Sequence, residues 1–203
     1  MKYDMYKYER ELCKRGYEFI CGVDESGRGP LAGPLFVAAV ILPLGKKYKY
    51  INDSKLLNEK KRKLAYEEVV TNALSISVSV ATVDEIDKYN IYQCTKMKMI
   101  NSIKTLEIKP DFVLIDAMNI EEIQNKLSLI KGDRRSISIA AASVVAKVKR
   151  DEYMLQLDEK YPMYNFQKNK GYPTKQHKML LKQFGPCNEH RKSFKPVKDL
   201  LLK

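Results

Sequence analysis

The stretch VDESGRGPLAGP, Val23 to Pro34, holds two adjacent carboxylates, one arginine, three glycines and two prolines within twelve residues. Apolar sequence lies on both sides of it, YEFICG before and LFVAAVIL after, so the chain is predicted to leave one buried strand here and enter another. A turn needs neither Asp24 nor Glu25, and neighbouring carboxylates repel each other. The reason for the pair must therefore come from the rest of the chain.

Hydrophobic patterning predicts a mixed sheet flanked by helices. The predicted strands are Tyr17–Val23, Leu35–Leu42, Leu74–Val83, Asp111–Ile115 and Leu127–Ile130. The run LSISVSVATV alternates, as a half-buried antiparallel strand does, whereas DFVLI is apolar throughout, as in a strand covered on both faces. Helices are predicted from Asn58 to Asn72, from Ile91 to Leu106 and from Ser138 to Tyr161, where Pro162 ends the last one. No linker or repeat divides the chain, which predicts one α/β domain over residues 1–203.

Three acids, Asp24, Asp116 and Asp133, each follow a predicted strand. If the first and fourth strands are parallel neighbours, Asp24 and Asp116 come within a few ångströms of each other, at the strand ends where α/β proteins bind ligands. The alternative for any one acid is an ordinary turn residue. Carboxylates clustered at about 4 Å would cost several kcal/mol unless cations compensate them. All-oxygen sites favour Mg²⁺ or Mn²⁺, and two histidines with no Cys-x-x-Cys pair make a zinc site improbable.

The charge is strongly basic, with 37 Lys and Arg against 25 Asp and Glu and a net charge of +12. From Tyr161 onward the only acids are Glu189 and Asp199, and aromatic residues are interleaved with many lysines. This mixture suits nucleic acid, and the alternative is a general lysine bias on a solvated surface; composition leaves both open. No apolar run approaches the roughly 20 residues of a membrane span, and the charged start of the chain lacks a signal peptide's apolar core. A cytoplasmic location and free thiols are expected.

Seven segments together resemble the ribonuclease HII family, in the family's order and over nearly the whole chain. They are VDESGRGPLAGP, NDSKLL, LIDA, KGD, SISIAAASVVAKVKRD, KNKGYPT and GPCNEHRKSFKPV. The resemblance implies a ribonuclease H-like fold with a five-stranded mixed sheet, and a basic, mostly helical part from about 160 to 203. It implies an endonuclease that hydrolyses the RNA strand of RNA–DNA hybrids and cuts 5′ of single ribonucleotides in duplex DNA. The products carry 5′-phosphate and 3′-hydroxyl ends, and the enzyme is expected to serve ribonucleotide removal as a monomer.

The same resemblance assigns roles to individual residues. The family's catalytic, metal-binding carboxylates fall on Asp24, Glu25, Asp116 and Asp133, which would hold two Mg²⁺ or Mn²⁺ ions. The loop Gly27-Arg28-Gly29 matches the family's reader of the ribose 2′-hydroxyl, the group that separates RNA from DNA. Tyr172 matches the tyrosine that packs on the deoxyribose after the ribonucleotide.

Further residues are expected to touch the nucleic acid. Asn52, Ser54 and Lys55 would hold backbone phosphates, the alternative being a capped turn that enters the next helix. Lys147 and Arg150, three apart, would share one helix face toward the substrate. Ser143 would bond either substrate or its own helix, and His177 and His190 look structural or phosphate-adjacent.

Two rival identities remain in view. Ribonuclease HIII is a sister enzyme that lacks this Gly-Arg-Gly loop and usually carries an extra N-terminal domain, whereas about twenty residues precede Asp24 here. A non-catalytic basic nucleic-acid-binding protein would explain the charge, but it would leave the carboxylates unexplained.

Overall fold

The computed structural model describes residues 4–52, 54 and 57–202 and is built on one five-stranded sheet with the strand order β3-β2-β1-β4-β5. The strands are β1 Ile20–Ser26, β2 Leu35–Ile41, β3 Ser75–Ala81, β4 Phe112–Asp116 and β5 Lys126–Leu129. Strands β1, β2 and β3 pair antiparallel, whereas β4 lies parallel to both β1 and β5. The predicted mixed sheet is therefore confirmed, and β1 is its central strand.

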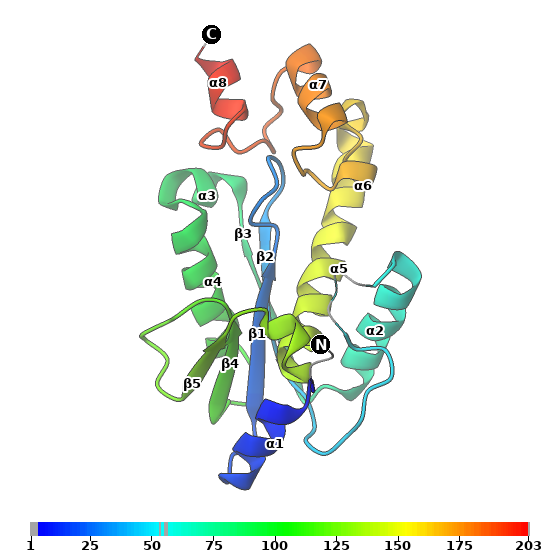
Figure 1. Cartoon of the computed structure of the whole chain (residues 1–203). Coiled ribbons are helices and arrows are strands. Elements are labelled where there is room, and N and C mark those ends of the chain that lie inside the picture. Colours follow the sequence, from blue (N-terminus) through cyan, green and yellow to red (C-terminus); the bar gives the residue numbers. More distant parts are fainter. Residues whose placement is uncertain (1–3, 53, 55–56, 203) are drawn as a thin grey trace.

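Helices cover both faces of the sheet (Figure 1). They are α1 Lys7–Lys14, α2 Glu59–Asn72, α3 Val83–Tyr89, α4 Ile91–Lys104, α5 Ile137–Lys160, α6 Phe166–Asn169, α7 Lys175–Phe184 and α8 Val197–Leu201, with 3-10 turns η1 Gly132–Arg134 and η2 Pro162–Tyr164. In Figure 1, α3 and α4 lie on one side of the sheet, while α5 and α2 lie on the other. Helices α6 to α8 gather at one end, which confirms the helical C-terminal part.

The helix boundaries follow local chemistry. Asn58 caps α2 by accepting a hydrogen bond from the Lys61 amide, as predicted. Ser136 caps α5 in the same way through the Ile139 amide, and Pro162 follows where α5 ends. The short helices α1 and α3 were not predicted. Thr82 and Glu85 form a capping box at the start of α3, a signal that is readable in the sequence.

Helix α5 lies unusually close to β1. A Cβ atom on Gly22 would come 2.0 Å from the carbonyl carbon of Ser138, so only glycine lets the strand and the helix meet there. Beyond this point the small residues Ala140, Ala141 and Ala142 pack into the core formed with β2. This contact places the middle of α5 over the carboxyl end of β1.

Strand β3 alternates as predicted, but its serines face inward. Ser75, Ser77 and Ser79 are buried, while Val78 and Val80 are 37% exposed. The serine hydroxyls are satisfied by the segment that ends α4: Ser77 Oγ lies 2.6 Å from Thr105 Oγ1, and Ser79 Oγ accepts from Asn101 Nδ2 at 2.9 Å. Hydrogen bonding to the end of α4 thus satisfies the serines on the buried face.

No helix within the described ranges is long and apolar enough to cross a membrane.

Candidate active site

Three of the four predicted carboxylates lie among the last residues of two adjacent strands. Asp24 and Glu25 stand inside β1, which continues to Ser26, so the expectation that they follow the strand is wrong. Pairing with β2 extends the strand, because Ser26 is still opposite Phe36. Asp116 is the last residue of β4, and the parallel register sets Val23 beside Ile115, one residue before each acid. The predicted parallel neighbourhood of the two strands is confirmed.

Asp24 carries the clearest electrostatic signature of the site. Its side chain is 2% exposed, and Oδ1 accepts a hydrogen bond from the Glu25 amide at 2.7 Å. Its Oδ2 is buried without a hydrogen-bond partner in the part of the chain that the structure describes. Burial raises the pKa of Asp24 well above its ordinary value, and the negative charges of Glu25 and Asp116 raise it further. A positive charge beside Oδ2 would relieve all three effects.

Asp133 reaches the same region through a turn. The Gly132 amide donates to Asp116 Oδ1 at 2.6 Å, which ties the end of β4 to η1. Asp133 is the next residue, is 2% exposed, and lies three residues before Ser136, the cap of α5. Asp133 is therefore the neighbour in sequence of Gly132, which contacts Asp116 directly.

The carboxylate oxygens of this site are the type of ligand that a hard divalent cation prefers. Among the described residues, no three His, Cys, Asp or Glu side chains are gathered closely enough to hold a metal as they stand. Yet Oδ2 of Asp24 is a buried oxygen with no hydrogen-bond donor among the described residues, and its neighbours Glu25 and Asp116 offer only oxygen ligands. Such a set suits Mg²⁺ or Mn²⁺.

Glycine shapes the loop after β1, and Arg191 holds the loop through its main chain. Gly27 has φ +107°, a left-handed conformation that favours glycine, and its carbonyl accepts from Arg191 Nη2 at 2.6 Å. Arg28 is exposed, and its Nη1 lies 3.6 Å from Glu25 Oε1. Sequence reasoning missed Arg191, because the segment HRKSFKPV reads only as a basic packing element.

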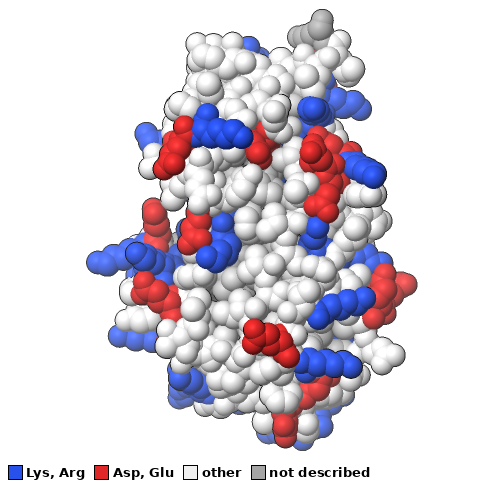
Figure 2. Space-filling view, turned by 180° about the vertical axis from the view of Figure 1, so that it is seen from behind, with Lys and Arg blue, Asp and Glu red and all other residues white. Residues whose placement is uncertain are grey.

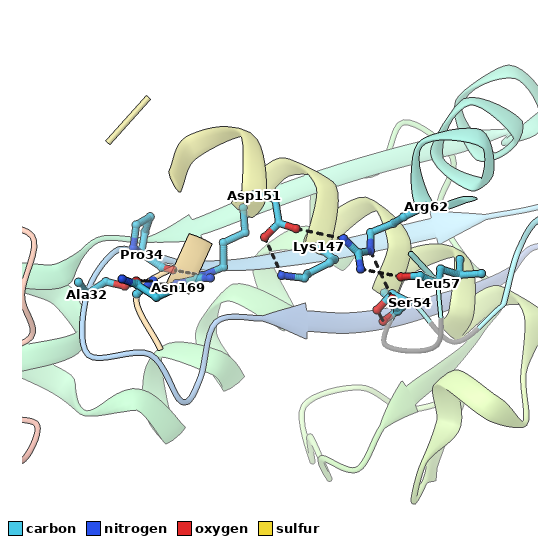
Figure 3. Close-up of polar contacts among 11 residues, drawn as sticks. Ala32, Pro34, Ser54, Leu57, Arg62, Lys147, Asp151 and Asn169 are labelled. Carbon is cyan, nitrogen blue, oxygen red and sulfur yellow. Dashed lines mark hydrogen bonds and ion pairs between the residues drawn. The ribbon is translucent and has the colours of Figure 1, made fainter. Parts of the chain in front are cut away.

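Arg150 requires a correction. It does not share a solvent-facing side with Lys147, because its side chain is 0% exposed. It donates to the carbonyls of Ala32 and Pro34, each at 3.2 Å, which are drawn at one end of Figure 3. Because Arg150 is buried and bonded to these carbonyls, it acts on the loop rather than on an open phosphate surface.

Tyr172 lies next to the glycine loop. Its side chain is 38% exposed, and a Cβ on Gly29 would be 3.8 Å from its ring. The guanidinium carbon of Arg150 is 5.6 Å from the ring centre, which is within cation–π range. The two elements predicted to read the substrate therefore adjoin each other.

A polar row joins α2 to α5 beside the site (Figure 3). Asp151 pairs with Lys147 at 2.6 Å and with Arg62 at 3.3 Å. Ser54 and Ser143 are both 3% exposed, and their hydroxyl oxygens are 2.9 Å apart. Ser143 thus hydrogen-bonds Ser54.

The remaining predicted contacts are placed only in part. Asn52 is exposed between β2 and α2. Lys55 lies outside the described residues. Figure 2 shows basic and acidic side chains interspersed on the face seen from behind, with no continuous basic track on that face.

Several C-terminal aromatic residues turn inward. Tyr164 and Phe166 are 3% and 0% exposed and pack on the rings of His177 and His190. Both histidines are fully buried, which agrees with a structural role for them. The aromatic interleaving seen in the sequence is thus partly core packing.

Comparison with known proteins identifies the family. The family model "Ribonuclease HII" matches residues 21–197. Relatives of that name are 47% identical in Geobacillus sp. (strain WCH70), over 98% of this chain and 72% of theirs, and 52% identical in Listeria monocytogenes serovar 1/2a, over 98% and 76%. The chain therefore belongs to the ribonuclease HII family. It is a ribonuclease H endonuclease, which sets aside a non-catalytic binding protein.

Solved structures agree on the fold. Ribonuclease H2 from Pyrococcus horikoshii OT3 superposes with a TM-score of 0.77 at 23% identity, covering 89% of this chain and 96% of that one. RNase HII of the Archaeoglobus fulgidus PCNA:RNase HII complex gives 0.75 at 24%, covering 87% and 95%. Bst-RNase HIII in complex with Mn²⁺ gives 0.65 at 19%, covering 92% and 70%. The predicted ribonuclease H-like fold is confirmed.

Proposed function

We propose that this ribonuclease H cleaves the RNA strand of RNA–DNA hybrids and cuts duplex DNA on the 5′ side of a single embedded ribonucleotide. The products would carry 5′-phosphate and 3′-hydroxyl ends. The observation that carries the proposal is the buried Oδ2 of Asp24, which has no hydrogen-bond partner within the described part of the chain and lies beside the charges of Glu25 and Asp116. A stable fold tolerates such a cluster poorly, so its presence points to chemistry.

The carboxylates Asp24, Glu25, Asp116 and Asp133 would hold two divalent cations, Mg²⁺ or Mn²⁺. When bound, such a pair lowers the pKa of an attacking water and stabilises the leaving 3′-oxygen. The protein's own part is to keep these oxygens oriented: the Glu25 amide holds Asp24 Oδ1, and the Gly132 amide holds Asp116 Oδ1. The contact with the Glu25 amide engages only Oδ1 of Asp24, so its Oδ2 would face a ligand.

Selection of the ribonucleotide would fall to the loop and the tyrosine. Gly27 is buried and its carbonyl is bonded to Arg191, whereas the exposed Gly29 would leave main-chain groups uncovered where a ribose 2′-hydroxyl can approach. Tyr172 would pack on the following deoxyribose, where a second 2′-hydroxyl would collide with the ring. Their adjacency supports joint recognition of an RNA-to-DNA junction.

A cleavage assay with Asp116→Asn tests the metal site. The substrates are duplexes with one ribonucleotide, with an all-RNA strand and with DNA only, each assayed with Mg²⁺ and with Mn²⁺. Cleavage of the ribonucleotide substrates should be abolished in the variant while binding survives. Asp84→Asn, at an exposed acid in α3, is the matched control and should cleave normally. Retained turnover in Asp116→Asn would remove this residue from the site.

Tyr172→Ala tests the junction reader. Cleavage at a single ribonucleotide should fall far more than cleavage of an all-RNA strand. Phe184→Ala removes another exposed C-terminal ring, 49% exposed, and should leave the ratio of the two rates unchanged. An unaltered ratio in Tyr172→Ala would show that the ring is not the sensor.

A further inference from the structure

Two arginines are buried where arginine is seldom found. Arg150 and Arg191 are both 0% exposed, and a guanidinium without solvent is costly unless its donors are used. Burial lowers the pKa of Arg191 to about 9. The side chain therefore stays charged at neutral pH. Both arginines direct donors at main-chain carbonyls of the segment 27–34.

Arg191 brackets this segment at both ends. Its Nη2 donates to Gly27 O at 2.6 Å, and its Nη1 donates to Arg28 O at 3.0 Å. Its Nε and Nη2 donate to Gly33 O at 3.0 and 2.8 Å. A planar guanidinium can serve three carbonyls in this way, whereas a lysine ammonium presents a single nitrogen.

Main-chain bonds join the same segment to the turn that carries Tyr172. The Leu31 amide donates to Gly171 O, and the Arg191 amide donates to Leu31 O, each at 2.8 Å. Arg150 adds a contact from α5, since it holds Ala32 O and also lies over the Tyr172 ring. The glycine loop and Tyr172 are thereby fixed to each other through buried contacts.

We propose that Arg191 is a specificity-determining positioning residue, which holds the main chain of Gly27 and Arg28 at a set spacing from Tyr172 before the substrate binds. The inference rests on the proposed function, because it assumes that this loop meets the ribose. Arg191 touches no substrate in this scheme. It removes the loop-ordering cost that would otherwise reduce the advantage of a ribonucleotide over a deoxyribonucleotide.

Arg191→Lys tests this role because it keeps the positive charge but loses the planar guanidinium that bonds three carbonyls at once. The variant is combined with Asp116→Asn, so that binding is measured without turnover. Dissociation constants are determined in Mg²⁺ for a duplex with one ribonucleotide and for an all-DNA duplex of the same sequence. The dissociation constant of the all-DNA duplex divided by that of the ribonucleotide duplex should fall at least about tenfold toward one. The constant of the all-DNA duplex itself should change less than about threefold. Arg15→Lys, an exposed substitution in the same background, should leave the ratio unchanged.

The outcomes separate the two levels of the argument. If the Asp116→Asn protein discriminates and folded Arg191→Lys discriminates equally well, the role of Arg191 is overturned and the proposed function stands. If the Asp116→Asn protein itself shows a ratio near one, both fail. A loss of thermal stability alone, with the ratio intact, would mark Arg191 as merely structural.

A measurement on the unaltered protein keeps the idea testable if the lysine variant does not fold. Amide hydrogen exchange should show Leu31 and Gly33 protected in the free enzyme to a degree similar to β2. Their amides donate to Gly171 O and Glu189 O in the structure. Exchange at the rate of an open loop would overturn preordering by Arg191.

Discussion

The Nε2 atoms of His177 and His190 lie 3.1 Å apart in the protein interior, so one of them must donate and the other accept. His177 Nδ1 is 2.9 Å from Tyr172 O, a carbonyl that can only accept, and so this nitrogen carries the hydrogen. The Cys187 amide donates to His190 Nδ1 at 3.0 Å, which puts the hydrogen of His190 on Nε2. Both rings are therefore neutral, with opposite tautomers, and a second proton on either would break the chain of bonds.

Acid should destabilise the protein through this pair. Burial lowers the pKa of both histidines, that of His190 to about 4 with help from His177, against 6.5 for a free histidine. Because the unfolded chain binds the protons more readily, stability should fall as the pH drops from 6.5 toward 4. The chain has two histidines, so imidazole ¹⁵N spectra at pH 5.5 should show one Nδ1–H and one Nε2–H form. An imidazolium signal there would contradict this assignment.

Divalent cations should stabilise the protein through Asp24. Without metal, Asp24→Asn is expected to raise the free energy of unfolding by about 1 kcal/mol, because it removes a buried charge near Glu25 and Asp116. The variant should therefore unfold at a higher urea concentration than the natural protein. With Mg²⁺ at a hundred times its dissociation constant, the natural protein should gain about 2.7 kcal/mol and the variant almost nothing. Urea titrations with chelator and with metal measure both effects. Equal gains in the two proteins would place the ion elsewhere.

Gly22→Ala should destabilise the fold by about 3 kcal/mol or more, because the new methyl group would overlap the Ser138 backbone. Backbone cannot move aside as a flexible side chain can. Gly29→Ala is the matched control for stability, since its nearest neighbour would be 3.8 Å away. Chemical denaturation of both variants tests the difference, and similar midpoints would show that α5 can withdraw from β1.

Glu9 should make stability depend on pH in the opposite direction. It is 5% exposed, and its Oε1 accepts from Ser136 Oγ at 2.5 Å and from the Ser138 amide at 3.0 Å. Burial raises the pKa of Glu9, outweighing the hydrogen bond from Ser136. Its contribution is therefore fully present below the unfolded value of 4.5 and is lost as the pH rises through the folded value. The stability of the natural protein relative to Glu9→Gln should decline from pH 4.5 upward, and a flat difference would refute this.

Periodicity predicted the sheet well because burial repeats along each strand. It placed all five strands within a few residues, and the positions of Asp24 and Asp116 followed from the parallel pairing of β1 and β4. The predicted end of β1 was too early. Asp24 and Glu25 are typical of a turn by local pattern, but pairing with β2 continues the strand to Ser26. On β3 the serines are inside, since their partners lie on a helix that a strand pattern cannot reveal.

The candidate site shows the same limit more sharply. The spacing of Lys147 and Arg150 predicts their relative positions on α5. It does not show that segment 27–34 packs against α5 at Arg150 and buries it. Arg191 bonds Gly27 across 164 positions of sequence, and no local pattern marks it. The metal-binding roles of the four carboxylates and the substrate contacts remain predictions.

Asp24 belongs to the middle strand, with neighbours hydrogen-bonded along both of its edges. A central strand opens only when the whole domain does, whereas edges and loops fray at much lower free energy. Heat inactivation of this nuclease should thus coincide with global melting.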